Sequence, residues 1–304
     1  MRIFVTGATG FVGSAVVAEL KNAGHQVAGL ARSEQGARSL IAAGAEVVRG
    51  SLEDLESLRR GASNSDGVVH TAFIHDFSNY AASAEADRRA IEALGTALAG
   101  SGRPLVVTSG TLLLQRTSSL ATEKDEPVPN FPRKSEEAGL AFASQGVRVS
   151  VIRLPPSVHG DGDHGFVPML FAIAREKGVS AYLGDGLNHW PAVHRLDAAR
   201  LYRLAVEKGV AGARYHGIAD EGVLFRDISR LIGQHLNVPL VSKSPEEAAG
   251  HFGWMSSFVG VDCPASSAQT QQQLGWRPAN ASLIADIKRP AYFEAQTALA
   301  AEGK

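Results

Sequence analysis

Several features that mark secreted, membrane or nucleic-acid-binding proteins are missing from the sequence. Its 304 residues contain a single cysteine, Cys263, so no internal disulfide can form, and we expect a reducing, cytoplasmic location. With 30 basic and 31 acidic residues, the net charge of -1 leaves no broad basic field for nucleic acid. The uncharged stretch 3–18 is similar to a signal peptide only superficially, because Gly7, Gly10 and Gly13 interrupt it and it is too short to span a membrane. We therefore expect neither nucleic acid nor membrane as a partner.

The composition and rhythm of the chain are those of a globular α/β protein. Hydrophobic residues make up 44% and charged residues 20%, which excludes disorder as the main state. Short apolar runs alternate with segments of helical periodicity, and this alternation predicts a parallel sheet with helices on both faces. The predicted strands are 2–6, 26–31, 45–49, 67–71, 104–108 and 148–153. The predicted helices between them are 11–23, 34–43, 52–60, 85–100 and 132–145.

The alternation breaks down after residue 154, and this change predicts a second structural unit. Helical patterns near 166–177, 195–208, 225–236 and 267–274 are mixed with loops and short strands. We expect residues 1–158 to form a Rossmann domain with a doubly wound parallel sheet. Residues 159–304 should form mainly a small C-terminal mixed α/β cap that binds substrate, with some segments returning to the Rossmann sheet.

A glycine-rich turn is the strongest motif. Residues 6–13 read TGATGFVG, which places the spacing G-x-x-G-x-x-G between the first predicted strand and helix. The first glycine permits a sharp turn, the second lets backbone N–H groups approach a pyrophosphate, and the third lets the helix pack closely on the strand. A turn without a ligand is the alternative, but the flanking elements favour a dinucleotide at the helix N-terminus. The expected cofactor contacts are Gly7, Thr9, Gly10, Phe11 and Val12.

The residues after the second predicted strand distinguish two dinucleotides. An acidic side chain there would bind the ribose hydroxyls of NAD, but the chain has Arg32 followed by Ser33. A guanidinium cannot accept a hydrogen bond from a hydroxyl, yet it can bind a 2′-phosphate and stack on adenine. We therefore expect NADP(H) rather than NAD(H), with Arg32 and Ser33 as contacts. A solvated surface arginine is the alternative.

With these residues in place, the chain resembles the extended and atypical short-chain dehydrogenase/reductases, which are often grouped with the NAD-dependent epimerase/dehydratases. The similarity spans residues 1–278, and its landmarks after the glycine turn are 51–52, 69–73, 106–109, 153–160, 193–199 and 274–278. The resemblance implies that adenine lies beside 51–52, the ribose beside 69–73 and the nicotinamide near 153–160. The further cofactor contacts that it implies are Ser51, Leu52, Thr71, Ala72, Phe73, Thr108, Pro155 and Val158.

The resemblance also implies a catalytic Tyr-x-x-x-Lys pattern on the fifth helix, and here the chain departs from it. In the family chemistry a tyrosine, with its pKa lowered by the nearby lysine, exchanges a proton with the substrate oxygen. The matching positions hold Pro132 and Glu136, so both standard catalytic side chains are missing.

Three interpretations of this departure stay open. The chain could be a reductase in which another group or water supplies the proton. It could be a sensor or other non-catalytic protein that only binds NADP(H). It could also be an epimerase or dehydratase of the sugar-nucleotide type that uses other residues. We favour the first, an NADP(H)-dependent oxidoreductase acting on a carbonyl or alcohol of a small or medium organic molecule.

Several polar side chains could replace the missing pair. The hydroxyl of Ser109, or of Thr111 two residues further on, could orient a carbonyl, although either could merely cap the strand. His159 is a candidate proton donor because imidazole titrates near neutrality, with loop packing as the alternative. Lys134 lies two positions from the expected lysine, about 200° around the helix, so we expect it to be solvated. The candidate substrate contacts are His75, Tyr80, His164, Trp190 and His194, with core packing as the rival role for Trp190 and structural ordering for His194.

Two other chemistries are disfavoured. The segment 159–164, HGDGDH, offers four potential metal ligands, but no partner set occurs elsewhere, so we expect a substrate loop and no metal site. The absence of a G-x-S-x-G motif disfavours a serine hydrolase. The expected partner is a small-molecule substrate, and the chain should be a monomer or a homodimer. The resemblance implies that a dimer would pair through 85–100 and 132–146.

Overall fold

The protein is built on a parallel sheet, seen here in a computed structural model that describes residues 1–76, 79–290 and 292–293. In this part of the chain, seven strands pair in the order β10-β6-β5-β4-β1-β2-β3, all of them parallel. Their bounds are β1 Arg2–Thr6, β2 Gln26–Ala31, β3 Glu46–Arg49, β4 Gly67–His70, β5 Pro104–Gly110, β6 Arg148–Leu154 and β10 Ala213–His216. The predicted Rossmann-type doubly wound sheet is confirmed.

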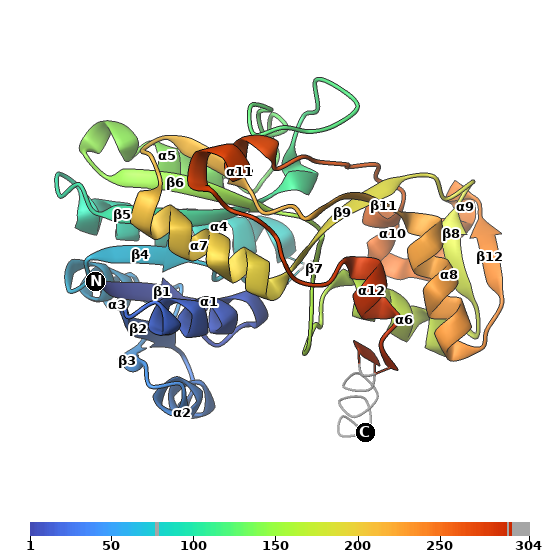
Figure 1. Ribbon diagram of the computed structural model, residues 1–304, viewed down its shortest axis with the longest axis horizontal. Helices are drawn as coiled ribbons and strands as arrows, with labels where there is room; N and C mark the ends of the chain where they lie inside the picture. The colour runs from blue at the N-terminus through green and yellow to red at the C-terminus, as the bar shows by residue number, and fades with distance from the viewer. Residues whose placement is uncertain (77–78, 291, 294–304) are drawn as a thin grey trace.

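Helices cover both faces of this sheet (Figure 1). One face carries α1 (Phe11–Asn22), α2 (Glu34–Ala42) and α7 (Arg195–Lys208). The other face carries α3 (Leu55–Ser63), α4 (Tyr80–Leu98) and α5 (Ser135–Leu140). The central strand β4 is buried along its whole length, as expected for a strand covered on both faces.

Three predicted helices have different bounds in the structure. The third begins at Leu55, because the side chain of Asp54 caps it by accepting a hydrogen bond from the Ser57 amide at 3.2 Å. The fourth begins earlier than predicted, at Tyr80. The single predicted helix 132–145 is divided into α5 and a 3-10 turn at Ala143–Gln145. Pro132 is exposed and lies outside α5, which starts only at Ser135.

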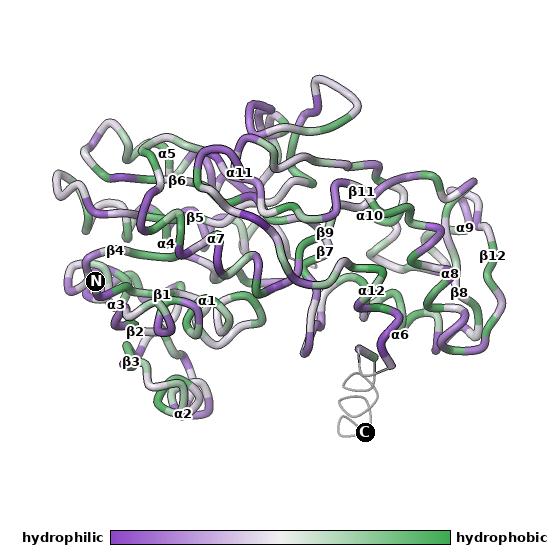
Figure 2. Tube along the Cα trace, in the orientation of Figure 1, coloured by the Kyte–Doolittle hydropathy of each residue, from purple (hydrophilic) through white to green (hydrophobic). Residues whose placement is uncertain are grey.

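The cap lies at the carboxyl ends of the strands (Figure 1). Its strands form two small sheets, β11-β9-β7 and β12-β8, with bounds β7 Ser157–His159, β8 Ser180–Leu183, β9 His189–His194, β11 Asp220–Leu224 and β12 Leu240–Lys243. Its helices are α6 Phe166–Lys177, α8 Phe225–Leu236, α9 Pro245–Phe252, α10 Ser256–Val259 and α12 Leu283–Ile287. Hydrophobic and hydrophilic residues alternate along α8 (Figure 2), and its apolar positions Phe225, Ile228 and Ile232 enter the cap core.

Parts of the second half return to the first. Helix α7 packs against α1, β10 extends the sheet beyond β6, and α11 (Ala268–Leu274) lies against β10. The buried Asp197 fixes this arrangement: its carboxylate accepts the backbone amides of Ala279 at 3.0 Å and Asn280 at 2.9 Å, and its carbonyl accepts the Trp276 indole N–H at 2.9 Å. Two sequence landmarks that are far apart in the chain therefore meet. Among the described helices, none is long and apolar enough to cross a membrane.

Candidate active site

The first and third glycines of the turn are required by packing within the chain. Gly7 has a φ of +67°, and a Cβ atom there would lie 2.7 Å from the Ala72 amide nitrogen. A Cβ atom on Gly13 would lie 2.0 Å from the carbonyl oxygen of Gly7. The Thr71 hydroxyl donates a further hydrogen bond, to the carbonyl of Thr6 at 2.7 Å. These contacts hold the start of α1 tightly against the end of β1.

The second glycine is different, because little in the chain itself requires it. Gly10 is exposed and its backbone is extended. The atom nearest to a Cβ added there would be the Gly7 carbonyl oxygen, at 3.2 Å. Gly10 is also the N-cap of α1, where no side chain caps the helix. The amides of Phe11 and Val12 precede the first amide that donates within the helix, that of Ser14 to the Gly10 carbonyl, and therefore remain available to an anion. A Cβ atom would fill the space beside these amides, so the residues present fit the diphosphate of a dinucleotide.

Positive charge lies where β2 and β3 end. Arg32 is exposed and makes no hydrogen bond or ion pair within the described residues. Ser33 caps α2 by accepting the Gly36 amide at 3.1 Å. Arg49, which follows in register on β3, donates to the Ser33 carbonyl at 3.2 Å and to Glu34 at 2.8 Å. Sequence reasoning missed Arg49, although the parallel pairing of the second and third strands could have placed it beside Arg32.

Ser51 and Leu52 shape the turn after β3. The Ser51 hydroxyl oxygen accepts the amides of Glu53 and Asp54, each at 3.3 Å. Leu52 is buried among the residues of the α3 face. In this arrangement Ser51 already orders the backbone of the loop at which the resemblance implies adenine.

A buried chain of polar groups runs behind the ends of β1, β4 and β5. The Thr6 hydroxyl is hydrogen-bonded to His70 Nδ1 at 2.8 Å, and His70 Nε2 lies 3.0 Å from Asp87 Oδ1. The other carboxylate oxygen of Asp87 accepts the Ser135 hydroxyl. Burial alone raises the pKa of Asp87, but hydrogen bonds from His70 and Ser135 and the charge of Arg133 lower it overall. The carboxylate therefore stays ionised.

Arg133 projects into this region from just before α5. Its guanidinium carbon lies 4.1 Å from the centroid of the Phe73 ring, and its Nη2 donates to the Thr108 carbonyl at 3.0 Å. Its Nε donates to the Ser135 hydroxyl at 2.8 Å and lies 3.9 Å from Asp87. Sequence reasoning missed Arg133, because these contacts exist only once β4, β5 and α4 are assembled. Lys134 lies at the surface, 3.4 Å from Glu137, as predicted for a solvated lysine.

Glu136, at the position that matches the family lysine, is buried in an ion pair. Its carboxylate accepts two hydrogen bonds from Arg153, at 2.8 and 2.7 Å, and one from Arg214 at 3.2 Å. Arg153 is fully buried and Glu136 is 4% exposed. Burial opposes ionisation, but hydrogen bonds from Arg153 and Ser109 and the charges of Arg153 and Arg214 lower the pKa of Glu136 overall. This residue joins α5 to β6 and β10.

A pocket of about 370 Å³ opens beside the end of β5. Ser109, Arg133 and Glu136 contribute to its wall, as does the segment 126–129. Ser109 is nearly buried there and is hydrogen-bonded to Glu136. Thr111 is also buried, and its hydroxyl has no hydrogen-bond partner within the described residues. Both predicted hydroxyls thus lie at the carboxyl end of β5.

Three of the predicted substrate residues, His75, Tyr80 and His164, pack against aromatic rings that follow the ends of β1 and β4. Ring centroids of Phe73 lie 5.3 Å from His75 and 5.8 Å from Tyr80, and His164 lies 5.6 Å from Phe11. Burial and the charge of Arg133 lower the pKa of His75, whereas burial raises the pKa of Tyr80. The guanidinium of Arg195 lies 4.8 Å from the Phe11 centroid.

The other three histidine and tryptophan candidates anchor the cap instead. His159 is fully buried, with Nδ1 at 2.6 Å from Asp286, so it has no exposed surface through which to reach a substrate. His194 caps α7 by accepting the Leu196 amide at 3.2 Å, and its ring packs edge-on against His159. Trp190 is fully buried in the cap core.

The loop between β7 and α6 is also held by contacts within the cap. Asp161 pairs with Arg289, and Asp163 accepts a hydrogen bond from the Tyr292 hydroxyl. The predicted cofactor contact Pro155 is buried just before β7, and Val158 is half-buried within β7.

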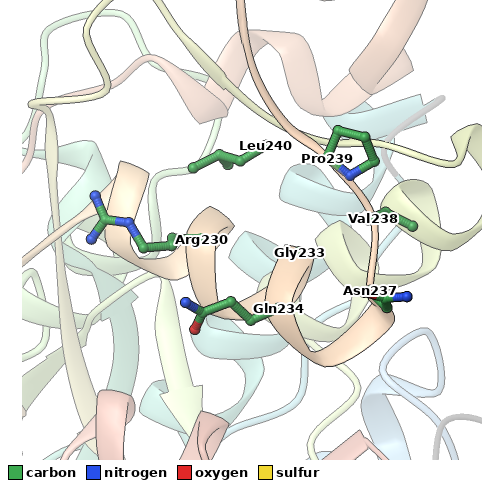
Figure 3. A pocket seen from close by; sticks show the side chains of 7 residues that line it. All are labelled: Arg230, Gly233, Gln234, Asn237, Val238, Pro239 and Leu240. Carbon is green, nitrogen blue, oxygen red and sulfur yellow. The ribbon is translucent and has the colours of Figure 1, made fainter.

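A second large pocket, of about 420 Å³, lies on the cap at the end of α8 and the segment leading into β12 (Figure 3). Its walls are Arg230, Gly233, Gln234, Asn237, Val238, Pro239 and Leu240. Figure 1 shows this end of the cap on the far side from the Rossmann sheet. The pocket is therefore separate from the site at the strand ends.

Comparison with known proteins agrees with this geometry. A family model described as the NAD-dependent epimerase/dehydratase family matches residues 3–218. The fold and the glycine turn define a Rossmann-fold protein of the extended short-chain dehydrogenase/reductase type. The chain belongs to the NAD-dependent epimerase/dehydratase family.

Individual relatives differ widely in similarity. An uncharacterised protein of Schizosaccharomyces pombe is 54% identical, covering 96% of this chain and 100% of the relative. The 4-hydroxy-2-methyl-3-oxo-4-farnesyl-3,4-dihydroquinoline-1-oxide ketoreductase of Stigmatella aurantiaca is 28% identical over 87% of this chain and 84% of its own. Among solved structures, dTDP-glucose 4,6-dehydratase from Streptomyces venezuelae with NAD bound has a TM-score of 0.79 at 20% identity, covering 98% of both chains. That structural likeness confirms the fold.

Proposed function

We propose that the protein is an NADP(H)-dependent oxidoreductase that interconverts a carbonyl and an alcohol on a small or medium organic molecule. The observation that carries the proposal is the opening at Gly10, where an uncapped helix start faces a space that a Cβ atom would fill. Family membership supports dinucleotide binding, and the similarity to a ketoreductase supports carbonyl chemistry.

The preference for NADP(H) rests on Arg32. Its guanidinium is exposed at the end of β2 and has no acidic partner within the described residues, so it can bind a 2′-phosphate without first breaking an ion pair. Arg49 lies next to the Ser33 backbone but is paired with Glu34 at 2.8 Å, so Arg32 is the cation that remains uncompensated there. An acidic side chain for the NAD ribose hydroxyls is replaced here by a cation.

The chain's own groups would position the substrate and handle the proton. The bound cofactor supplies the hydride chemistry. The Thr111 hydroxyl, just after β5, has no partner within the described residues and is the one available to a carbonyl oxygen, because the Ser109 hydroxyl already donates to Glu136. A phenol is protonated at neutral pH and burial raises the pKa of Tyr80 further, so Tyr80 can donate a hydrogen bond toward the substrate from beside Phe73. His75, which also packs against Phe73, is a second group able to exchange a proton.

A second candidate is binding without catalysis. It is favoured by the observation that Pro132 is exposed outside α5 and Glu136 is held in a buried ion pair, so neither serves as an acid or base at the substrate. An epimerase or dehydratase is the third possibility, and it predicts an oxidised cofactor that remains bound through purification.

Titration calorimetry with NADPH and NADH, followed by turnover measurements, tests these alternatives. We expect NADPH to bind more tightly and to be consumed with at least one member of a panel of ketones and aldehydes. Arg32→Gln should weaken NADPH alone, whereas Arg38→Gln, another exposed arginine on α2, serves as the matched control. Tighter NADH binding would contradict the cofactor assignment. Saturable NADPH binding with no turnover would favour the binding-only function.

A further inference from the structure

The position of Arg133 relative to the glycine turn defines which half of a dinucleotide it would face. The turn follows β1, and Arg32 follows β2, on one side of it. An adenosine directed toward Arg32 leaves the other half of the cofactor to extend the opposite way, over the ends of β4 and β5. Arg133 stacks on Phe73, just beyond β4, and donates to the Thr108 carbonyl of β5. It therefore lies on the nicotinamide side.

The guanidinium is fixed before any ligand arrives. Its Nε–H is used by Ser135 and one Nη2–H by the Thr108 carbonyl, while Asp87 balances its charge at 3.9 Å. His70 and Thr6 support Asp87 from behind. A cation held in this way needs no rearrangement to bind, and an arginine stays charged at any physiological pH.

Part of this guanidinium remains available. Of its five N–H groups, neither hydrogen on Nη1 nor the second on Nη2 has an acceptor within the described residues. The side chain is 15% exposed, so the available edge reaches the site while the rest is buried. The position that matches the family lysine cannot provide a cation, because Glu136 stands there and is paired with Arg153.

We propose that Arg133 is the residue that binds the hydroxyl groups of the nicotinamide ribose, and so supplies the fixed positive charge that the chain lacks at its lysine position. This inference rests on the proposed function, because it requires NADP(H) in the cleft. Arg133 thereby positions the reactive half of the cofactor, and Arg32 secures the adenosine half.

The two halves of the cofactor can be tested separately by calorimetry on the full chain. NADPH carries both halves, whereas adenosine 2′,5′-bisphosphate carries the 2′-phosphate but no nicotinamide ribose. We expect Arg133→Gln to weaken NADPH by about 10- to 100-fold, the range of a charge-assisted hydrogen bond, and to leave the bisphosphate within about twofold. Arg89→Gln, an exposed arginine on α4 that does not line this pocket, is the matched control and should change neither.

The outcomes separate the inference from the function on which it rests. If the unmodified protein binds neither ligand, the proposed function fails. If it binds both and Arg133→Gln leaves NADPH unchanged, or weakens both ligands equally, the assignment of Arg133 is overturned while NADPH binding stands. If Arg133→Gln does not fold, phenylglyoxal labelling of the unmodified protein decides. Protection of Arg133 by NADPH but not by the bisphosphate supports the assignment, and equal labelling with both ligands refutes it.

Discussion

Replacing Glu136 by glutamine should destabilise the protein strongly, although this residue lies at a family catalytic position. The substitution keeps the shape of the side chain but leaves the fully buried Arg153 guanidinium without its anion. Removing one partner of such a pair typically costs about 3–5 kcal/mol. Arg214, at 3.2 Å, would also lose its inner partner and keep only Glu126. For a chain of 304 residues we expect the melting temperature to fall by roughly 5–8 °C.

Thermal and urea unfolding of Glu136→Gln measures this effect, and Glu137→Gln is the matched control. Glu137 is the next residue on the same helix, but its side chain is 75% exposed and its partner Lys134 is at the surface, so its loss should change the melting temperature by less than about 2 °C. A double variant, Glu136→Leu with Arg153→Met, should cost far less than the sum of the two single changes, because both charges are removed together. A melting temperature of Glu136→Gln within about 2 °C of the unmodified protein would refute this reasoning.

Acid should remove the difference between the two proteins. The folded-state pKa of Glu136 lies below its ordinary value of 4.5, so the carboxylate contributes stability that is present above that value and is lost as the pH falls through the folded-state pKa. Glutamine mimics the protonated form. The unfolding curves of Glu136→Gln and the unmodified protein should therefore approach each other toward pH 3, and a constant gap from pH 7 to pH 3 would contradict the ionised pair.

Three other changes test the remaining parts of the site. Gly10→Val should abolish NADPH binding by calorimetry and lower the melting temperature only slightly, because the backbone there is extended and the added Cβ meets only the Gly7 carbonyl oxygen, at 3.2 Å; retained binding would show that no phosphate approaches this amide. Arg32→Gln should raise the Kd for NADPH by about 10- to 100-fold and leave NADH unaffected, and an equal effect on both would assign Arg32 to the general surface. Asp286→Asn should lower the melting temperature strongly at pH 7 and much less near pH 3. The reason is that the hydrogen bond from His159 keeps the pKa of Asp286 low in the folded state despite burial. An equal drop in melting temperature at both pH values would argue against an ionised Asp286.

Local signals in the sequence were sufficient for most of the Rossmann half. The strands and the glycine turn are encoded by short apolar runs and by glycine spacing, both of which act over a few neighbouring residues. Strand β10 was not predicted, because Ala213–His216 has two polar residues in four and is recognised as a strand only by its pairing with β6. The helix predicted at 132–145 was too long, since the pattern ignored how Pro132 and Arg133 would be held by the tertiary structure.

The candidate site was less accessible from the sequence for a similar reason. Its main cation, Arg133, is held in place by a hydrogen bond to the carbonyl of Thr108, 25 residues earlier, and by the charge of Asp87 on another helix. His159 looked like a proton donor from its place after the sixth strand, but a partner 127 residues later, Asp286, holds it inside the cap. Residue type alone therefore nominated a chemical group without showing which way it would face.

The chain returns to the sheet at β10 between the two parts of the cap, so the two halves cannot be separated by a single cut. A protein ending at residue 158 would lack α7 and β10, and the outer edge of β6 would present unpaired backbone groups to other molecules. Such a fragment should aggregate instead of binding nucleotide. Grafting a cap from one relative onto another would accordingly require several junctions. The segments around Asp197 and around 276–280 would have to come from the same protein, because they are hydrogen-bonded to each other.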